Sequence, residues 1–446
     1  MGGCVAMSAS AQETKQSQDL SVELNPVVVT GTGTHHRLKD TPTPVEVVTA
    51  NDIKKAGITD FREAMTALVP SLSFSTNSMG DYLMLNGLSN KYVLILINGK
   101  KLTGDSSNNI DLNRIDMSNV KRIEVLKGAG SALYGSDAIG GVINIITNQP
   151  INDITVTSNT KVEERGQFTQ TANVDIKTEK FASYTSYQRR QSDGWTLTRV
   201  DADGEARDQH DANAFYTDNY TQMFQFTPND KLSMYVEGSY YDRTVKRQPE
   251  YLKYNLTYDA YSLGAGAKYN FNKRSYIQFD IKNDNYDTNY LYTNEDGDNK
   301  VGDEVRQKRQ HYYSGNLKSL FRFTENTRTI FGVEYIQETL DRPSFNVDER
   351  AYTWAAYAQE EITLFKNLQI QAGLRYVYHE TAKSNVTPKL AVMYRLGDFT
   401  IRGQYSAGFR APGLDELYKY SYSQRGTRAG TVSYTHLRAH ETRSNL

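Results

Sequence analysis

Alternation of apolar and polar residues over most of the chain is the feature that most limits its fold. In the segment LQIQAGLRYVYHE, Ile370 and Leu374 fall on one face of an extended chain, and Gln371 and Arg375 fall on the other. A period of two is the geometry of a β-strand and not of a helix. The pattern recurs in FTIRGQYSAGFR and, less regularly, at 167–178, 181–190, 213–228, 231–241, 258–270, 275–288, 307–323, 328–338, 351–365 and 387–396. About thirteen long strands are therefore predicted after residue 154.

Short and long connections alternate between these strands. The short ones are TEK, PND, NKR, TENT, KN and GD, and the long polar ones lie at 191–212, 242–257, 289–306 and 339–350. Bilayer-spanning barrels have short turns at one end, longer loops at the other, and strands of ~10 residues with one apolar face, because no backbone group can stay unpaired in lipid. We therefore predict a transmembrane antiparallel β-barrel at 151–430. A soluble protein of several β-sandwiches is the alternative.

The composition agrees with strands in a membrane. It argues against a helical membrane protein and gives no support for a nucleic-acid-binding protein. The chain has 32 Tyr among its 446 residues, and aromatic residues favour strands. Mean hydropathy is −0.63, and no apolar run reaches the ~18 residues that a transmembrane helix needs. The net charge of −1 gives no sign of a nucleic-acid partner.

Residues 40–150 have a different, mixed pattern that predicts a compact α+β domain. TPTPVEVVTANDIKKAG reads as a strand followed by a helix, and TDFREAMTALVP reads as a second helix, with Asp60 and Glu63 at capping-box spacing. KYVLILINGKKL reads as a buried strand that turns at Asn98–Gly99. VKRIEVLKGAGSALYG reads as a strand and a tight loop, after which GGVINIITN forms another buried strand.

The N-terminus carries a compartment signal. MSASAQET has Ala9 and Ala11 in the A-x-A arrangement of a secretory cleavage site, so residues 1–11 are interpreted as the remnant of a signal peptide. A disordered N-terminus is the alternative. The single cysteine, Cys4, cannot form an internal disulfide.

Three segments of the chain closely resemble the TonB-dependent outer-membrane receptors, in which an N-terminal plug domain sits inside a large barrel. They are VLILINGKKL, VKRIEVLKGAGSALYGSDAIGGVINIITN and GFRAPGLDELY. The resemblance implies that residues 40–150 are the plug and that five glycines shape plug loops against the barrel wall. These glycines are Gly128, Gly130, Gly135, Gly140 and Gly141.

The resemblance also implies a barrel of 22 strands, of which this sequence supplies about thirteen. We therefore expect an open, curved wall around the plug. Residues 431–446 show no alternation and resemble translated adapter sequence, so they are expected to be a non-native tail that stays unpacked.

Members of the family carry a short energy-coupling segment near the mature N-terminus, and PVVVTG matches it in type and position. Its residues are Pro26, Val27, Val28, Val29 and Thr30. An exposed extended segment suits capture by strand addition, which would let the inner-membrane TonB energy-transducing protein pull on it. Residues 12–39 are accordingly expected to form a periplasmic coupling segment and flexible linker. The alternative is that Val27–Val29 form the first strand of the plug.

The sequence indicates ligand-binding residues less strongly than it indicates the plug and the barrel. His210, His311 and His379 are expected near the end with the long loops, where an imidazole could hold haem iron, and Arg410 follows the last alternating strand. Acidic loops around Asp201, Asp203, Asp296 and Asp298 do not have EF-hand spacing and are interpreted as solvated loops, with calcium as the alternative. His35 and His36 form a further adjacent pair in the linker. No catalytic residue, resident metal or cofactor is predicted, and no phosphate loop or CxxC motif is present.

Together these features predict active uptake of a ferric siderophore or haem across the outer membrane of a Gram-negative bacterium. The expected partners are outer-membrane lipid, the TonB protein and a small iron chelate. Cobalamin, another metal chelate or a glycan is the alternative cargo. A passive porin-like or adhesin barrel is the alternative of a different class.

Overall fold

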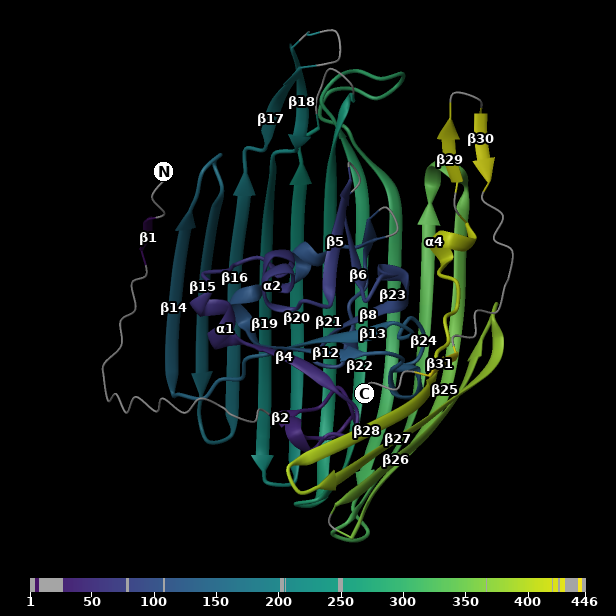
Figure 1. The fold of residues 1–446 in the computed structure, drawn as a ribbon. Helices are drawn as coiled ribbons and strands as arrows, with labels where there is room; N and C mark the ends of the chain where they lie inside the picture. Colours follow the sequence, from purple (N-terminus) through teal and green to yellow (C-terminus); the bar gives the residue numbers. More distant parts are fainter. Residues whose placement is uncertain are drawn as a thin grey trace.

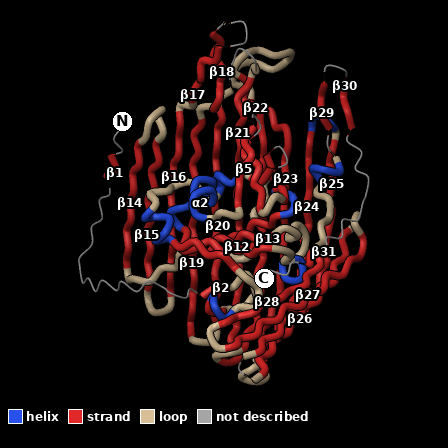
Figure 2. Tube along the Cα trace, in the orientation of Figure 1, coloured by secondary structure: helices blue, strands red, loops and turns tan. Residues whose placement is uncertain are grey.

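The computed structural model describes residues 5–7, 27–77, 80–106, 109–200, 204, 206–247, 252–365, 367–418, 420–423, 426–429 and 440–442. A tall curved wall of antiparallel strands encloses a smaller mixed domain on its concave side (Figure 1). Strands make up most of the wall, the enclosed domain mixes strands, loops and helices, and the few helices are short (Figure 2). None of the described helices is long and apolar enough to cross a membrane.

The enclosed domain is the predicted plug, built on a five-stranded sheet in the order β4-β12-β13-β8-β9. Its strands are β4 (Val45–Thr49), β5 (Leu72–Asn77), β6 (Gly80–Leu85), β7 (Leu88–Ser89), β8 (Val93–Ile97), β9 (Lys100–Lys101), β10 (Asp105–Ser106), β11 (Asn109–Ile110), β12 (Val120–Lys127) and β13 (Gly141–Thr147). Its helices are α1 (Ala50–Lys55), α2 (Phe61–Leu68) and α3 (Ser131–Tyr134), with 3-10 turns η1 (Leu38–Asp40), η2 (Asn90–Tyr92), η3 (Leu112–Arg114) and η4 (Met117–Asn119). β13 runs parallel to β8 and antiparallel to β12, so the aliphatic runs of β8 and β13 lie side by side in the core.

Local sequence signals place the plug helices where they were expected. The Asp60 side chain caps α2 by accepting from the Glu63 backbone N–H, at 3.0 Å. Thr49 and Asp52 form a reciprocal capping box at the start of α1. The turn after β8 has positive φ at both Asn98 and Gly99, as an Asn-Gly hairpin turn requires.

The wall has thirteen long strands joined in chain order, which confirms the predicted partial barrel. They are β14 (Ile154–Val162), β15 (Phe168–Lys177), β16 (Phe181–Ser192), β19 (Phe215–Asn229), β20 (Leu232–Val245), β21 (Tyr254–Asn272), β22 (Ser275–Tyr292), β23 (Glu304–Phe321), β24 (Thr327–Arg342), β25 (Val347–Leu364), β26 (Leu368–His379), β27 (Lys383–Leu396) and β28 (Phe399–Ala407). The loop at 193–214 carries the hairpin β17 (Trp195–Val200) and β18 (Ala206–Ala212), and α4 (Leu414–Leu417) precedes the hairpin β29 (Tyr420–Ser423) and β30 (Gly426–Ala429).

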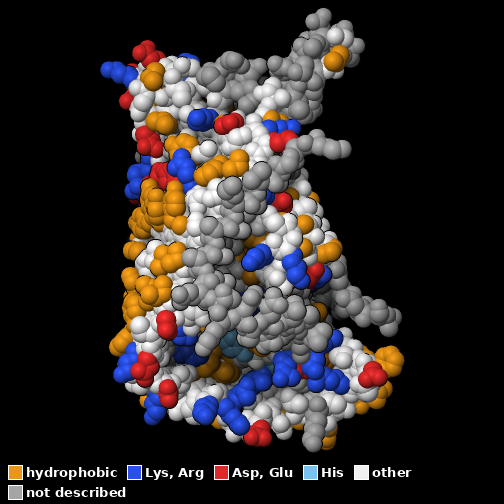
Figure 3. All heavy atoms as spheres, turned by 90° about the vertical axis from the view of Figure 1, so that its left-hand side faces the viewer, with side chains coloured by type: hydrophobic (Ala, Val, Ile, Leu, Met, Phe, Trp, Pro, Cys, Tyr) orange, Lys and Arg blue, Asp and Glu red, His pale blue; other side chains and the backbone are white. Residues whose placement is uncertain are grey.

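The two faces of the wall follow the alternation. In β26, Leu374 is 52% exposed on the outside, whereas Gln371 is fully buried and Arg375 is 2% exposed on the plug side. Hydrophobic side chains line the outer margin of the wall in Figure 3, and charged side chains concentrate toward the two ends. Apolar residues thus face lipid, and polar residues face the plug.

Two of the predicted long loops are shorter in the structure than expected. The connection expected at 339–350 is only 343–346, with the 3-10 turn η5 (Pro343–Phe345), and that expected at 242–257 is 246–253. The strands continue further because backbone pairing does not require an amphipathic side-chain pattern once the chain is clear of the hydrocarbon layer. Sequence alternation therefore marks the lipid-facing part of a strand and not its full length.

The wall is open among the described residues, as expected, because β14 and β28 do not pair with each other. Each instead pairs with a three-residue strand: β1 (Val5–Met7) lies beside β14, and β31 (His440–Thr442) lies beside β28. The expectation of a wholly unpacked tail is therefore wrong for residues 440–442. Unpaired edge groups of β28 accept this short strand irrespective of its side chains.

The glycines of the plug signature give a test of its packing. A Cβ at Gly141 would overlap the backbone carbonyl oxygen of Leu126 in β12, whereas a Cβ at Gly140 would meet mainly the Leu88 side chain, at 2.9 Å. Gly141→Ala should therefore destabilise the protein by about 1–3 kcal/mol, more than Gly140→Ala does, because a strand backbone cannot move aside as a side chain can. Thermal unfolding in detergent measures both variants. Gly403→Ala, at an exposed site with open space, is the control, and equal melting temperatures for all three variants would contradict the close approach.

Candidate functional site

The N-terminal segment, defined here as residues 27–43, lies between the plug and the lower end of the wall. Val27–Val28 (β2) pairs with His36–Arg37 (β3) to make a small hairpin. The segment was expected to be exposed and flexible, and the exposure is wrong for most of it, whereas its coupling role stays a prediction. All residues from 30 to 34 are buried, as are Val28 and His36, while Val27 is exposed. Pro26 lies outside the described residues.

The plug holds this segment through one buried carboxylate. Glu124 in β12 accepts from the Val29 N–H at 2.9 Å, the Thr30 N–H at 2.8 Å and the Thr30 hydroxyl at 2.6 Å. Its other oxygen accepts from the guanidinium of Arg122 at 2.7 Å. Tyr134 donates its hydroxyl to the Thr30 carbonyl at 3.0 Å. Because the carboxylate is fully buried, these donors replace the water it has lost.

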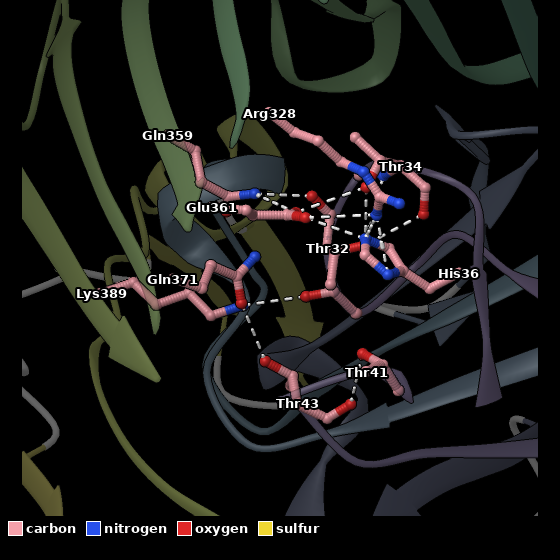
Figure 4. Close-up of polar contacts among 12 residues, drawn as sticks. Thr32, Thr34, His36, Thr41, Thr43, Arg328, Gln359, Glu361, Gln371 and Lys389 are labelled. Atoms are coloured by element: carbon pink, nitrogen blue, oxygen red, sulfur yellow. Dashed lines mark hydrogen bonds and ion pairs between the residues drawn. The ribbon is translucent and has the colours of Figure 1, made fainter. Parts of the chain in front are cut away.

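The wall holds the same segment from the opposite side (Figure 4). Three wall side chains donate to successive carbonyls: Lys389 to Gly31 at 2.9 Å, Gln359 to Thr32 at 2.6 Å, and Lys318 to Gly33 at 2.6 Å. Glu361 in β25 accepts from His36 at 2.8 Å and from the Thr34 hydroxyl at 3.3 Å.

Arg328 completes this lower contact, beside the ring of His36 and 3.6 Å from the Glu361 carboxylate. His36 is thus an internal contact, and its neighbour His35 is exposed.

A cavity of about 610 Å³ separates the plug from the wall. Val29, Gly33 and His35 line its lower end, and Arg410 and Glu416 line its upper end. The cavity therefore extends from the N-terminal segment toward α4, the helix at the opposite end of the wall (Figure 1).

Ion pairs fix the upper part of the plug to the wall. Asp111 accepts from Tyr241 at 2.6 Å and Tyr286 at 2.9 Å, and lies 3.3 Å from Arg243. Burial acts to raise the pKa of the Asp111 carboxyl, but Arg243 and these hydroxyl donors outweigh it and lower the pKa. Arg114 pairs with Asp284 of β22 at 2.7 Å.

A third ion pair lines the cavity. Lys101 contacts Asp137 at 2.9 Å, and Arg410 lies 3.5 Å from the other carboxylate oxygen. Burial acts to raise the pKa of Asp137, but Lys101 and Arg410 outweigh it, so the pKa lies below its usual value. Asp137 is consequently ionised at neutral pH.

The structure brings three of the predicted ligand residues to this one cavity. His311, His379 and Arg410 all line it. His379 already accepts from the backbone N–H groups of Thr381 and Ala382, both at 3.1 Å, so it stabilises the turn after β26. Arg410 is likewise engaged by Glu416. The side chain of His210 lies outside the described part of the chain.

The acidic loop around Asp296 shows no metal site among its described residues. Asp296 pairs with Lys253 at 3.0 Å in a solvated turn, which agrees with the loop interpretation, and Asp201 and Asp203 lie outside the described residues. Within the described part of the chain, no group of three His, Cys, Asp or Glu side chains could hold a metal ion.

Sequence reasoning missed the residues that bind the N-terminal segment. Lys318, Gln359 and Lys389 are inward-facing members of alternating strands, so the sequence marked them as polar-face residues without a partner. Glu124 offered a clearer signal, because it is a carboxylate between the apolar residues Ile123 and Val125 of β12 and a buried charge requires partners.

Comparisons with known proteins match both parts of the chain. Residues 37–142 match the family model "TonB-dependent Receptor Plug Domain", and residues 165–443 match "TonB dependent receptor-like, beta-barrel". The chain is 24% identical over 462 residues to the iron-regulated outer membrane virulence protein of Vibrio cholerae, covering 94% of this chain and 64% of that one. It is 25% identical over 423 residues to the vitamin B12 transporter BtuB of Vibrio cholerae, covering 89% of this chain and 64% of the transporter.

The fold is also similar to that of a solved structure of the ferric enterobactin receptor PfeA from Pseudomonas aeruginosa. The TM-score is 0.73 at 16% sequence identity, over 91% of this chain and 68% of that one. The chain thus spans less than two thirds of the length of the curated relatives named above.

The Lys101–Asp137 pair predicts a pH-dependent contribution to stability. Asp137→Asn keeps the shape and the positive φ of 72°, which asparagine tolerates, but removes the charge. At pH 7 the free energy of unfolding of the variant should be about 1–3 kcal/mol lower than that of wild type. Because the folded pKa lies below the unfolded value of ~3.9, wild type has this contribution above pH ~4 and loses it as the pH falls through the folded pKa.

The difference in melting temperature between wild type and variant should therefore shrink on acidification below pH ~4. Asp398→Asn, at an exposed turn position, is the control. A difference that stays constant from pH 7 to pH 3 would contradict the assignment.

Proposed function

Because this chain belongs to the TonB-dependent receptors, a family of outer-membrane proteins in Gram-negative bacteria, we propose that it takes up a scarce ligand, a ferric siderophore or haem, by energy-coupled transport. The whole receptor would bind the ligand from outside and release it into the periplasm. The outer membrane has no ATP, so the work must arrive mechanically from the inner-membrane TonB protein.

The observation that carries the proposal is how the plug is held inside the wall. Its upper loops are fixed by buried ion pairs such as Arg114–Asp284, whereas residues 29–33 of the N-terminal segment are held by hydrogen bonds to their backbone. A plug held in this way blocks passive flow, yet offers one end that a pulling partner could detach. This arrangement supports coupled transport over the passive porin-like or adhesin alternative.

The cargo is proposed from the relatives and from the cavity. Relatives whose names refer to iron or to enterobactin, and one named as a vitamin B12 transporter, match at comparable identity. The cavity is lined by His311 and Tyr312, side chains with which a chelate could form hydrogen bonds. We favour a ferric siderophore or haem, and cobalamin, another metal chelate or a glycan remains the second candidate.

Deleting residues 26–31 from the intact receptor separates coupled from passive transport. The variant should still bind its ligand at the cell surface, because the upper loops and the upper end of the cavity are unchanged, but uptake should fall to background because the partner has no strand to capture. Cell binding and uptake of radiolabelled ferric enterobactin, haem and cobalamin measure both steps and identify the cargo. Undiminished uptake by the deletion variant would overturn the proposal.

A substitution pair refines the same test. Val27 is exposed, so Val27→Pro removes a backbone donor and fixes φ without opening a core cavity, whereas Val27→Ala keeps the donor. The proline variant should lose uptake, and the alanine variant should retain it.

A further inference from the structure

One row of residues on the inner face of the wall crosses three neighbouring strands toward the lower end of the cavity. Lys268 of β21 is paired with Gln278 of β22, and Gln278 is paired with Lys318 of β23. Residues directly opposite one another share a face of the sheet, and all three residues line the cavity. Neighbouring strands lie about 4.8 Å apart, so the Cα atoms of the two lysines are separated by roughly 10 Å. Both ammonium groups can therefore reach a single ligand between them.

This row lies at the depth of the hydrocarbon layer. Phe279 and Leu317, the chain neighbours of Gln278 and Lys318, are exposed on the outer face of the wall. A lysine within a membrane-spanning segment is costly, and it is found where it has a partner or faces a water-filled cavity that serves as a pathway. Whether the two lysines have acidic partners therefore decides between a structural and a functional interpretation.

Most basic side chains around the cavity are paired with a carboxylate. This holds for Lys91, Lys100, Lys101, Lys282, Arg375 and Arg410. Lys268 and Lys318 are the exceptions, because neither has an ion pair within the described part of the chain. The structure thus compensates the charge of the other cavity cations but not the charge of these two.

The contacts that the two lysines do make leave their charge available. The ammonium of Lys268 lies 4.0 Å from the centre of the Tyr276 ring. Lys318 donates to the Gly33 carbonyl, at 2.6 Å. A ring face and a carbonyl oxygen carry only partial negative charge, and hydrogen bonds between two ionised groups are stronger. An anion would therefore be a better partner for both lysines than the groups they now contact.

Asp280, two positions along β22 from Gln278, lines the same cavity without cancelling this charge. Its carboxylate accepts from the Gln278 amide at 2.8 Å and from the Tyr235 hydroxyl. Both donors are neutral, and the single negative charge of Asp280 can offset only one of the two lysines. Together these three ionised side chains keep a net positive charge.

We propose that Lys268 and Lys318 form an inner oxyanion site, which binds carboxylate or catecholate oxygens of an iron chelate as it passes through the cavity toward the periplasm. The cavity volume of about 610 Å³ falls within the ~300–1,000 Å³ typical of small-ligand pockets. Lysine suits a passing ligand, because its three donors sit on a flexible stem and can follow an anion that moves.

The inner oxyanion site deepens the choice of cargo. It favours an anionic iron chelate, such as a catecholate siderophore or haem with its two propionates, over cobalamin, which carries no net charge. The inference rests on the proposed function, because it takes the transported ligand as the occupant of the site.

Protection from chemical modification tests the site without transport. Reductive methylation of Lys268 is followed by mass spectrometry in the intact receptor in detergent, at constant ionic strength. Citrate, which carries three carboxylates, should slow the reaction about threefold at twice its Kd, because a bound amine cannot react. Triethyl citrate has the same skeleton without the charges and should have no effect. Lys231, exposed in a short turn, is the control lysine.

Three results of this experiment would overturn the site. Equal slowing by triethyl citrate would show that charge is not recognised. Equal slowing at Lys231 would show that citrate acts on lysines in general. Equal protection by inorganic phosphate, at the same concentration as citrate, would assign the site to a small free anion and not to a chelate.

Variants at position 268 test the role of the site in transport. Lys268→Met removes the charge, Lys268→Glu reverses it, and Lys268→Arg retains it. Surface binding of radiolabelled ferric enterobactin or haem to cells should be the same in all three, because the row lies toward the lower end of the cavity. Uptake should fall about three- to tenfold in Lys268→Met and further in Lys268→Glu, and Lys268→Arg should restore most of it.

Lys231→Met removes a lysine from an exposed turn and is the control for these variants. Its uptake should equal that of wild type. A purely structural role of Lys268 predicts that uptake follows the melting temperature of each variant and not the charge at this position. Equally slow uptake by Lys268→Arg and Lys268→Met would therefore refute the inner oxyanion site.

The two experiments separate failure of the site from failure of the proposed function. If wild-type cells take up none of ferric enterobactin, haem and cobalamin, the proposed function fails, and the methylation result alone decides whether the site exists. If wild type takes up cobalamin but neither iron ligand, coupled transport stands and the inner oxyanion site is refuted.

Discussion

Hydrogen bonding of the backbone in lipid is the constraint on which the rest of the structure depends. A bilayer offers no partner to a free N–H or C=O, so a chain that crosses it as strands must pair them side by side. The long wall strands do so in register over most of their length. Alternation follows, because each residue that faces lipid places its neighbours on the inner face.

That inner face is polar, and it determines how the plug can be held. An apolar plug surface would leave Arg375, Gln371 and similar buried groups without partners. The interface instead has many hydrogen bonds and ion pairs, with an apolar contact where Leu133 of the plug packs against Leu320 and Ile330 of the wall. The main apolar core of the plug lies within its own sheet and helices. Such contacts are individually modest when exchanged for water, so a plug held this way can be stable and still be detached in parts.

The interface also differs from one end to the other. At the upper loops, oppositely charged side chains form buried ion pairs, as Arg114 and Asp284 do. Removing one partner of such a pair is strongly destabilising. At the N-terminal segment, the wall cations Lys318 and Lys389 meet carbonyl dipoles. Residues 29–33 are thus bound through their backbone, while the upper loops are bound through charged side chains, and the cavity is lined by residues from both regions.

The sequence alone determined the strands, their lipid and inner faces, the helix caps at Asp60 and the turn at Asn98–Gly99, because each rests on neighbours within a few residues. It could not determine that Thr30, Thr32 and His36 are buried, or that the segment after PVVV is held and not free. Those facts depend on partners 94 to 358 residues away, such as Glu124 of the plug and Lys389 of the wall, which only the tertiary packing of plug and wall brings into contact. Local pattern identifies which face a side chain belongs to, and tertiary structure decides which group it meets there.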